Sequence, residues 1–291
     1  MKFSEFIKNP ISKEPHLLLI GHPVSHSVSP IMHNLALREY HLDITYVAVD
    51  VHEHEIASLV AHFNSETFLG ANITLPYKQT LFDAVDEHSE LALEMGVINC
   101  IQKSDHKLIG HNTDSYGFVK PLQLKGYDHL ESALIFGYGG AAQAVIHGLQ
   151  TLGCNNIFVV SRNYDKNENE SHVNLISYDE WTEYVDEVEI IINTTPLGMY
   201  PNTHTSPVQD EYSIYLRDTL CYDIVYNPRQ TKFLEQASKQ GAMCIGGLPM
   251  LVHQAARSFE LWTNQPFPVQ RVEVHLSHVF PAHIHTPKEP K

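Results

Sequence analysis

The segment SALIFGYGGAAQAVIHGLQTLG, at residues 132–153, limits the possible fold more than any other stretch of the chain. Its apolar start predicts a buried strand, its glycines a tight turn, and its remainder a helix that ends at Gly153. In the turn, Gly137 allows the sharp reversal, Gly139 lets backbone N–H groups approach a phosphate, and Ala142 lets the helix pack closely on the strand. This order of strand, G-x-G-x-x-A turn and helix predicts a dinucleotide-binding site in an α/β fold.

Short apolar runs alternate with helical patterns along the rest of the chain. This order predicts mainly parallel sheets covered by helices on both faces, in two α/β domains that meet near residues 112–118. We expect residues 163–172 to form an exposed loop and the tail at 283–291 to be frayed. The other expected strands are 16–21, 44–51, 68–75, 156–162, 188–195, 219–226 and 241–247, and the other expected helices are 29–41, 53–63, one that starts at Pro76, and 251–262.

The end of the strand that follows the glycine turn indicates which dinucleotide is bound. A site for NAD usually has an acidic residue there, which accepts hydrogen bonds from the ribose hydroxyls. This chain has Ser161, Arg162 and Asn163 instead. An arginine at this place can pair with the 2′-phosphate of NADP, so the sequence favours NADP. NAD stays open at this point, because Asp165 could accept from a ribose if the loop folded back.

The charge and the cysteines of the chain narrow the classes of partner. The chain has 19 Lys and Arg residues against 34 Asp and Glu residues, and its formal net charge of −15 would repel nucleic acids and anionic membranes. The four cysteines are far apart and form no C-x-x-C motif, a pattern typical of a reducing compartment. The N-terminus has no signal-peptide pattern, and no run reaches the length of a membrane span. We therefore expect a cytoplasmic protein that binds neither nucleic acid nor membrane.

The 20 histidines include two tight groups, HEH at 52–54 and HIH at 283–285. Neither group has cysteine or carboxylate partners at the sequence spacing of zinc sites. We interpret both groups as solvated surface histidines and expect no metal.

The stretch GHPVSHSVSPIMHN, at residues 21–34, follows the first expected strand. Ser27 and Ser29 are separated by one valine, so in a short extended segment both hydroxyls would lie on one face. Pro30 then favours the first turn of a helix. Two hydroxyls placed in this way predict a clamp for a small polar anion.

Two further motifs carry polar side chains that suit a reactive site. In NITLPYK, Asn72 and Thr74 are alternate residues of a strand and share a face, and Lys78 falls in the first turn of the next expected helix. The motif HNTDSYG adds Asn112 and Asp114 near the expected domain boundary. Taken singly, residues of these types are most often a solvated lysine and a turn or helix cap.

Taken together, these motifs resemble the shikimate dehydrogenase family, and the resemblance extends from residue 16 to about residue 268. It implies an NADP-dependent oxidoreductase that reversibly reduces 3-dehydroshikimate to shikimate, a step of chorismate and aromatic amino-acid biosynthesis. Such a protein would act on this small molecule as a monomer or homodimer. The matching stretches, in the family's order, are SHSVSPIMHN, NITLPYK, GVINCI, NTDSYG, GYGGAAQA, NTTPLGM, YDIVYNP and GGLPMLVHQA.

The resemblance also implies roles for individual residues. Lys78 and Asp114 match the family's catalytic pair, with Lys78 as the proton donor and acceptor. Histidines are the alternative proton donors, at positions His33, His111 and His253. The implied substrate-binding residues are Ser27 and Ser29 for the carboxylate, with Tyr226 near it, and Asn72, Thr74, Asn99 and Gln254 for the ring hydroxyls. The implied cofactor-binding residues are Gly137, Gly139, Gly140, Ala141, Ser161, Arg162, Asn193, Thr194, Thr195 and Gly247.

For the domains, the resemblance implies a substrate-binding α/β domain at 1–113, a Rossmann NADP-binding domain at 114–247, and C-terminal helices at 248–291 that pack back on the substrate domain. The main alternative is an NAD-dependent quinate/shikimate dehydrogenase of the same superfamily. Ser29 and Arg162 disfavour it, because threonine at position 29 would suit relatives that prefer quinate. A paralogue that has lost catalysis is a further alternative, and the intact Lys78 counts against it.

Overall fold

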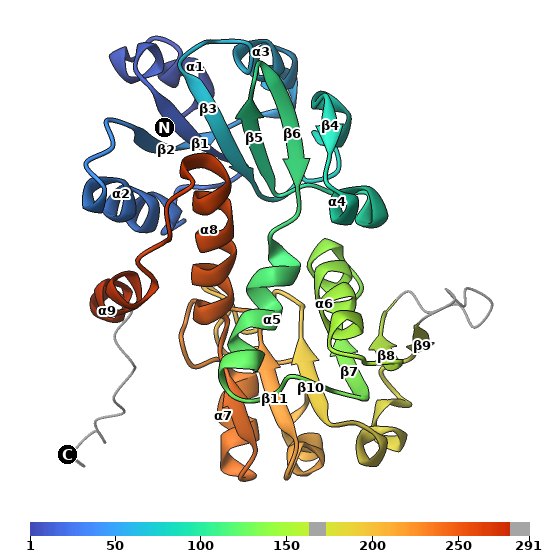
Figure 1. Cartoon of the computed structure of the whole chain (residues 1–291). Coiled ribbons are helices and arrows are strands. Elements are labelled where there is room, and N and C mark those ends of the chain that lie inside the picture. Colours follow the sequence, from blue (N-terminus) through green and yellow to red (C-terminus); the bar gives the residue numbers. More distant parts are fainter. Residues whose placement is uncertain (163–172, 280–291) are drawn as a thin grey trace. The chain divides into compact units, whose positions relative to one another are not determined.

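The computed structural model describes residues 1–162 and 173–279 (Figure 1). The chain divides into two compact units. The first unit holds Met1–Phe118 and Val252–Val272, and the second holds Val119–Leu251 together with residues 273–279. The loop expected at 163–172 and the tail expected at 283–291 lie outside the described residues. No described helix is both long and apolar enough to cross a membrane.

The first unit is built on a six-stranded sheet in the order β2-β1-β3-β5-β6-β4 (Figure 1). Strands β1, β2 and β3 are parallel to one another, whereas β5 runs antiparallel to both of its neighbours, β3 and β6. The strands β5 and β6 were not expected from the sequence. Because β5 pairs antiparallel with both neighbours, this sheet is mixed. The strands are β1 His16–Gly21, β2 Thr45–Asp50, β3 Phe68–Ile73, β4 Glu87–His88, β5 Cys100–Ser104 and β6 Lys107–His111.

Burial explains why the centre of this sheet forms where it does. Every residue of β1 is buried, as expected for a parallel strand that is covered on both faces. Its side chains join a core with the fully buried Phe6, Phe63 and Phe68. The helices of the first unit are α1 Phe3–Phe6, α2 Ser29–Glu39, α3 Ile56–His62 and α4 Glu90–Met95, and α5 Asp114–Leu124, α8 Gly247–Thr263 and α9 Val269–Val279 contribute residues to both units.

The helix expected from Pro76 is wrong. The chain there forms hydrogen-bonded turns, followed only by a short 3₁₀ helix at Phe82–Ala84. The carbonyl of Lys78 accepts a hydrogen bond from the backbone amide of Ile98, 3.1 Å away, rather than from an amide of its own turn. This tertiary contact draws the segment out of helical geometry, and Lys78 lies in a turn.

The second unit is built on a six-stranded sheet in the order β12-β11-β10-β7-β8-β9, and all its neighbouring strands are parallel (Figure 1). With β7 numbered 1 and the sheet read from β9 to β12, the order is 3-2-1-4-5-6, the order of a Rossmann sheet, so the predicted fold class is confirmed. The strand order reverses between β7 and β10. The strands are β7 Ser132–Phe136, β8 Asn156–Val160, β9 Asn174–Ile176, β10 Ile190–Asn193, β11 Leu220–Asp223 and β12 Met243–Ile245, and the helices within this unit are α6 Gly140–Thr151 and α7 Lys232–Lys239.

Candidate active site

Polar residues converge at one edge of the first sheet. Parallel strands β1, β2 and β3 all end at this edge. Because β5 is antiparallel to β3, it begins where β3 ends, and β6 runs back to the same place. Cys100 is therefore paired with Asn72 on one side and with His111 on the other. The two antiparallel strands thus bring Asn99, just before β5, and Asp114, just after β6, to the edge that also carries Lys78.

Lys78 and Asp114 form an ion pair. The ammonium Nζ of Lys78 donates to Oδ2 of Asp114, and the two side chains are 20% and 13% exposed. The other carboxylate oxygen, Oδ1, accepts from the side-chain amide of Asn99 at 2.7 Å. Asn112 also fixes this residue, since its Oδ1 accepts from the backbone amide of Asp114 at 3.0 Å. Both oxygens of Asp114 are thus held, and the carboxylate in turn orients the ammonium.

Asn99 is a rigid part of this arrangement. Its amide nitrogen donates to Asp114 and to Oγ1 of Thr113, and its amide oxygen accepts from the backbone N–H of Thr113 at 2.7 Å. The sequence analysis assigned Asn99 to the substrate hydroxyls and did not single out Thr113. In this arrangement both amide hydrogens of Asn99 are used, and its side chain orients Asp114; its contact with a substrate hydroxyl stays a prediction.

Asn72 lies in a similar network, only 5% exposed. Its amide oxygen accepts from the hydroxyl of Tyr46 at 2.9 Å, and its amide nitrogen donates to Ser258 at 2.9 Å and to the carbonyl of Asn99 at 3.3 Å. Sequence reasoning missed Tyr46 and Ser258. Neither belongs to a motif, and Ser258 is far from Asn72 in the sequence. Only the second lone pair of the Asn72 oxygen is left for a ligand.

The two serines of the expected clamp lie together. The hydroxyl of Ser27 donates to that of Ser29 at 3.2 Å, and it accepts from the backbone amide of Ser29 at 3.2 Å. The segment is not extended as expected, because Val28 has helical dihedral angles and Ser29 is the first residue of α2. The hydroxyls meet because the chain enters a helix. Two hydroxyls at a helix N-terminus lie in a field that favours an anion.

Two other expected substrate residues flank this group within the first unit. Thr74 directly follows β3 and is half-buried, and its backbone amide donates to the carbonyl of Ile20 at 2.8 Å. Gln254 lies on α8, and its carbonyl accepts from the hydroxyl of Ser258 at 3.1 Å. Since Ser258 also contacts Asn72, α8 places Gln254 one helical turn from the polar network.

Two of the three alternative proton donors, His33 and His111, are poorly suited to the task. His33 is fully buried and stacks on Tyr46 with ring centroids 4.3 Å apart, and burial lowers its pKa to about 3. Such a ring is neutral near neutral pH, and its one remaining N–H is a very weak acid. Burial lowers the pKa of the His111 imidazole most, and the positive charge of Arg257 lowers it further. The Nε2 of His111 is hydrogen-bonded to Oε1 of Gln102 at 3.1 Å.

In the second unit, the glycine turn lies where the order of the strands reverses. Gly137 directly follows β7 and has a φ of +99°, a backbone conformation that side chains other than glycine's rarely adopt. The helix α6 begins at Gly140 and has no side-chain cap at Gly139. A Cβ added at either of these two glycines would meet nothing within 4 Å. The turn thus leaves open space beside uncapped helix amides, which fits the pyrophosphate of a dinucleotide.

The end of β10, next to β7 in the sheet, carries three of the expected cofactor residues: Asn193, Thr194 and Thr195. Thr194 donates through its hydroxyl to the carbonyl of Phe136 at 2.8 Å, which ties the end of β10 to the end of β7. Asn193 is fully buried, and its amide oxygen accepts from the hydroxyl of Thr195 at 2.6 Å. The amide nitrogen of Asn193 donates to Asp223 at 3.0 Å. Burial raises the pKa of this carboxyl to about 6, against the hydrogen bonds from Thr231, Val225 and Asn193.

The remaining cofactor residues follow other strands of the same sheet. Ser161 and the exposed Arg162 directly follow β8, and Ala141 lies in the first turn of α6. The start of α8 approaches the end of β11 closely, because a Cβ at Gly247 would overlap the carbonyl of Ile224. Tyr226, expected near the substrate carboxylate, is half-buried in the second unit.

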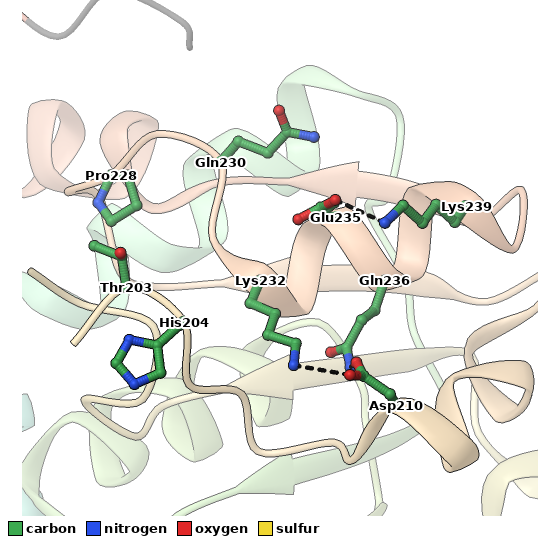
Figure 2. A pocket seen from close by; sticks show the side chains of 9 residues that line it. All are labelled: Thr203, His204, Asp210, Pro228, Gln230, Lys232, Glu235, Gln236 and Lys239. Carbon is green, nitrogen blue, oxygen red and sulfur yellow. Dashed lines mark hydrogen bonds and ion pairs between the residues drawn. The ribbon is translucent and has the colours of Figure 1, made fainter. Parts of the chain in front are cut away.

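A separate pocket of about 520 Å³ lies in the second unit around the start of α7 (Figure 2). Two ion pairs occupy its wall, Lys232 with Asp210 at 3.0 Å and Lys239 with Glu235 at 2.7 Å. No residue expected at the active site or the cofactor site lines it. Its charges are paired within the protein, and we assign it no part in the reaction.

Comparisons with known proteins agree with this geometry. Residues 19–101 match the model of the shikimate dehydrogenase substrate binding domain, and residues 247–273 match that of the shikimate 5′-dehydrogenase C-terminal domain. A shikimate dehydrogenase (NADP(+)) of Methanococcus maripaludis is 40% identical over 87% of this chain and 93% of its own length.

Solved structures are similar over nearly the whole chain. A shikimate dehydrogenase in complex with NADP+ is 33% identical, with a TM-score of 0.84, over 93% of this chain and 97% of its own. A quinate dehydrogenase from Corynebacterium glutamicum in complex with NAD is 27% identical, with a TM-score of 0.81, over 91% of this chain and 99% of its own. From these matches and the polar network at the sheet edge, the chain belongs to the shikimate dehydrogenase family.

Proposed function

We propose that the protein is an NADP-dependent shikimate dehydrogenase, which reversibly reduces 3-dehydroshikimate to shikimate in chorismate and aromatic amino-acid biosynthesis. The ion pair of Lys78 with Asp114 carries this proposal, together with the NADP-dependent relatives of the chain. Reduction of a ketone to an alcohol needs a hydride at carbon and a proton at oxygen. The structure offers a partly exposed ammonium at the edge where the polar residues of the first unit meet.

Lys78 is the proton donor in the reducing direction. Its ammonium gives a proton to the carbonyl oxygen of the substrate as negative charge develops there. In the oxidising direction the neutral amine accepts the proton of the alcohol. Asp114 holds the ammonium in place and accepts from the same substrate hydroxyl. Asn99 acts by keeping this carboxylate in position.

Ser27 and Ser29 bind the carboxylate of the substrate at the N-terminus of α2. Neutral hydroxyls and the helix field stabilise the anion without a cation, which suits a clamp in an acidic chain. The family resemblance also assigns Tyr226 to this carboxylate. The ring hydroxyls contact Thr74, Gln254 and the remaining lone pair of Asn72.

The cofactor residues of the second unit fit NADP. When bound, NADPH supplies the hydride that reaches the substrate carbon. Gly137, Gly139 and the first residues of α6 hold the pyrophosphate, and Arg162 pairs with the 2′-phosphate. Asn193, Thr194 and Thr195 shape the end of β10 beside the ribose. Gly247 contributes backbone near the nicotinamide carboxamide.

We also infer a cytoplasmic location and a monomer or homodimer that binds no nucleic acid. The net charge of −15 supports the absence of nucleic-acid binding, since phosphate would be repelled. All four cysteines are unpaired, which suits a reducing compartment. Light scattering of the purified protein tests the oligomeric state.

Purified protein tests the function directly. With shikimate and NADP the absorbance of NADPH should rise, and with 3-dehydroshikimate and NADPH it should fall. Quinate with NAD, tested at matched concentrations, should give a much smaller kcat/KM. An enzyme that preferred quinate and NAD would be the alternative member of the superfamily, and a protein without turnover on either pair would overturn the proposal.

A further inference from the structure

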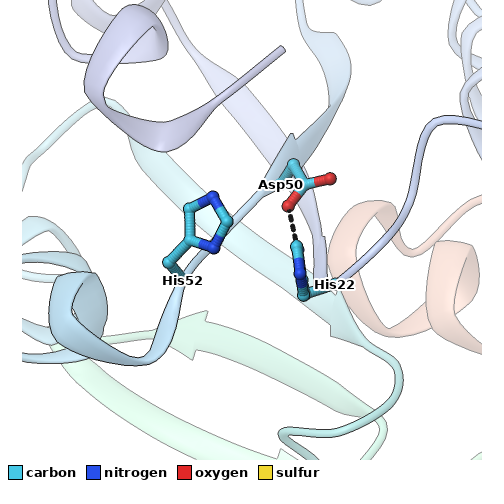
Figure 3. Close-up of side chains that lie close together, drawn as sticks. All are labelled: His22, Asp50 and His52. Atoms are coloured by element: carbon cyan, nitrogen blue, oxygen red, sulfur yellow. Dashed lines mark hydrogen bonds and ion pairs between the residues drawn. The ribbon is translucent and has the colours of Figure 1, made fainter.

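Three potential metal ligands meet at the edge of the first sheet. Figure 3 shows the side chains of His22, Asp50 and His52 close together, with Nδ1 of His22 2.5 Å from Oδ1 of Asp50. The rings of the two histidines have centroids 4.6 Å apart. One ligand atom from each of the three residues lies within 4.8 Å of the others. In the described part of the chain, this is the only such group of three histidine, cysteine or carboxylate residues.

The fold explains how residues so far apart in sequence come together. His22 directly follows β1, and Asp50 ends β2, the strand that pairs with β1 in parallel. The register places Gly21 opposite Asp50, and the backbone amide of Val51 donates to the carbonyl of Gly21 at 3.1 Å. The backbone amide of His52 is held by Oε2 of Glu55 at 2.9 Å. The three side chains therefore project from a fixed sheet end.

The distances suit a transition-metal ion. A tetrahedral zinc ion with bonds near 2.1 Å places neighbouring ligand atoms roughly 3.4 Å apart. The present separations lie on both sides of this value, from 2.5 Å between His22 Nδ1 and Asp50 Oδ1 to at most 4.8 Å within the cluster. The side chain of His22 is 44% exposed and that of Asp50 23%, so an ion can enter from solvent and water can complete its coordination.

The local charge also favours a cation. Burial, and then the charges of Glu53, Asp50 and Glu55, raise the pKa of the Tyr77 phenol, whose hydroxyl donates to the carbonyl of Val51 at 2.7 Å. Glu53 and Glu55 thus add negative charge near the cluster, beyond that of Asp50 itself. From the sequence alone His52 was interpreted as a solvated histidine, because its partner His22 lies far away in the sequence.

We propose that His22, Asp50 and His52 form a binding site for a divalent transition-metal ion, with Zn²⁺ as the best match. Two imidazole nitrogens and one carboxylate oxygen are ligands that zinc accepts, whereas Mg²⁺ prefers oxygen ligands alone. Metal binding at this site takes no part in the dehydrogenase reaction. His22 precedes the serine clamp in the connection between β1 and α2, so bound metal would restrain the start of that loop.

Calorimetric titration of the full chain with Zn²⁺ tests the site. The protein should carry no affinity tag and should be treated with chelator first. The variant H283A/H285A serves as the background, because the HIH motif could bind zinc by itself. In this background we expect one zinc ion per chain, no binding of Mg²⁺, and an increase in Tm on adding Zn²⁺.

His22→Ala and His52→Ala should each weaken zinc binding at least about tenfold and remove the increase in Tm. His54→Ala is the matched control, because its ring stacks on His52 with centroids 5.7 Å apart but lies outside the cluster. His62→Ala removes the other histidine pair, formed with His16, and should also leave binding unchanged. Unchanged binding in both His22→Ala and His52→Ala, or equal loss in His54→Ala, would overturn the proposal.

Discussion

The active-site edge of the first unit and the nucleotide turn of the second are built in different ways. In the first, side chains hold other side chains: Asn99 holds Asp114, and Asp114 holds Lys78. In the second, the backbone makes the site, through the φ of +99° at Gly137 and the uncapped start of α6. Removing one functional group from the first unit should therefore stop the reaction. Cofactor binding by the second unit should respond mainly to changes of backbone conformation.

The largest effect should come from Lys78→Ala. Loss of a positioned proton donor should lower kcat by about 10²–10⁴-fold, while KM for shikimate changes much less because the serine clamp remains. Lys107→Ala is the matched control, since it breaks a lysine–carboxylate pair with Glu87 whose side chains are 60% and 49% exposed. Steady-state kinetics of the two variants should differ sharply. If both variants lost equally little kcat, the chemistry of the first unit would not depend on the single ammonium group of Lys78.

The serine clamp should give the next effect. Ser27→Ala and Ser29→Ala should each lower kcat/KM for shikimate. The loss should correspond to about 1.5–3 kcal/mol of transition-state stabilisation, because each variant loses a hydrogen bond to a charged group. The affinity for NADP, measured by fluorescence titration, should be unchanged in both. If KM for shikimate stays at the wild-type value in both variants, the carboxylate binds elsewhere.

Arg162→Ala should separate the two cofactors. Only NADP carries the 2′-phosphate, so its binding should weaken by about 1.5–3 kcal/mol while binding of NAD is nearly unchanged. The expected value lies at the lower end, since Arg162 is exposed. Titrations with both dinucleotides measure the difference. Equal losses for the two would show that the arginine does not contact the phosphate.

The glycines of the turn should show the smallest and most selective effects. Gly137→Ala forces a side chain into a left-handed conformation, and its Cβ would lie 2.9 Å from Cγ2 of Thr195, so the free energy of unfolding should fall by about 1–3 kcal/mol. Gly139→Ala adds a methyl group in open space, so stability should be kept while KM for NADP rises. Urea unfolding and cofactor kinetics of the pair distinguish strain from lost phosphate contact. Equal stability of the two variants would contradict this account.

The comparison also explains what the sequence could reveal. The nucleotide turn is contiguous in sequence, so its strand, glycines and helix were predicted, and the Rossmann fold is confirmed. Lys78 and Asp114 were found through motifs. The residues that hold Asn72 and Asn99 were harder to find, because Tyr46, Ser258 and Thr113 are ordinary side chains that act through contacts distant in sequence.

The strands β5 and β6 and the segment after Pro76 were misjudged for related reasons. The strands β5 and β6 escaped notice because half-buried antiparallel strands of five residues give a weak pattern. The helix expected after Pro76 fails because the carbonyl of Lys78 bonds to Ile98 instead. In both cases long-range pairing outweighed local propensity, and these same pairings bring Lys78, Asn99 and Asp114 to one edge.

A double-mutant cycle on Lys78 and Asp114 tests the central claim most directly. Steady-state kcat should be measured at saturating shikimate and NADP for Lys78→Ala, Asp114→Asn and the double variant, with His111→Ala alongside. Because the ion pair acts as one unit, the double variant should lose much less than the product of the two single losses, and His111→Ala should keep most of its kcat. Losses that multiply fully, or a collapse of kcat in His111→Ala while Lys78→Ala remains active, would contradict the account.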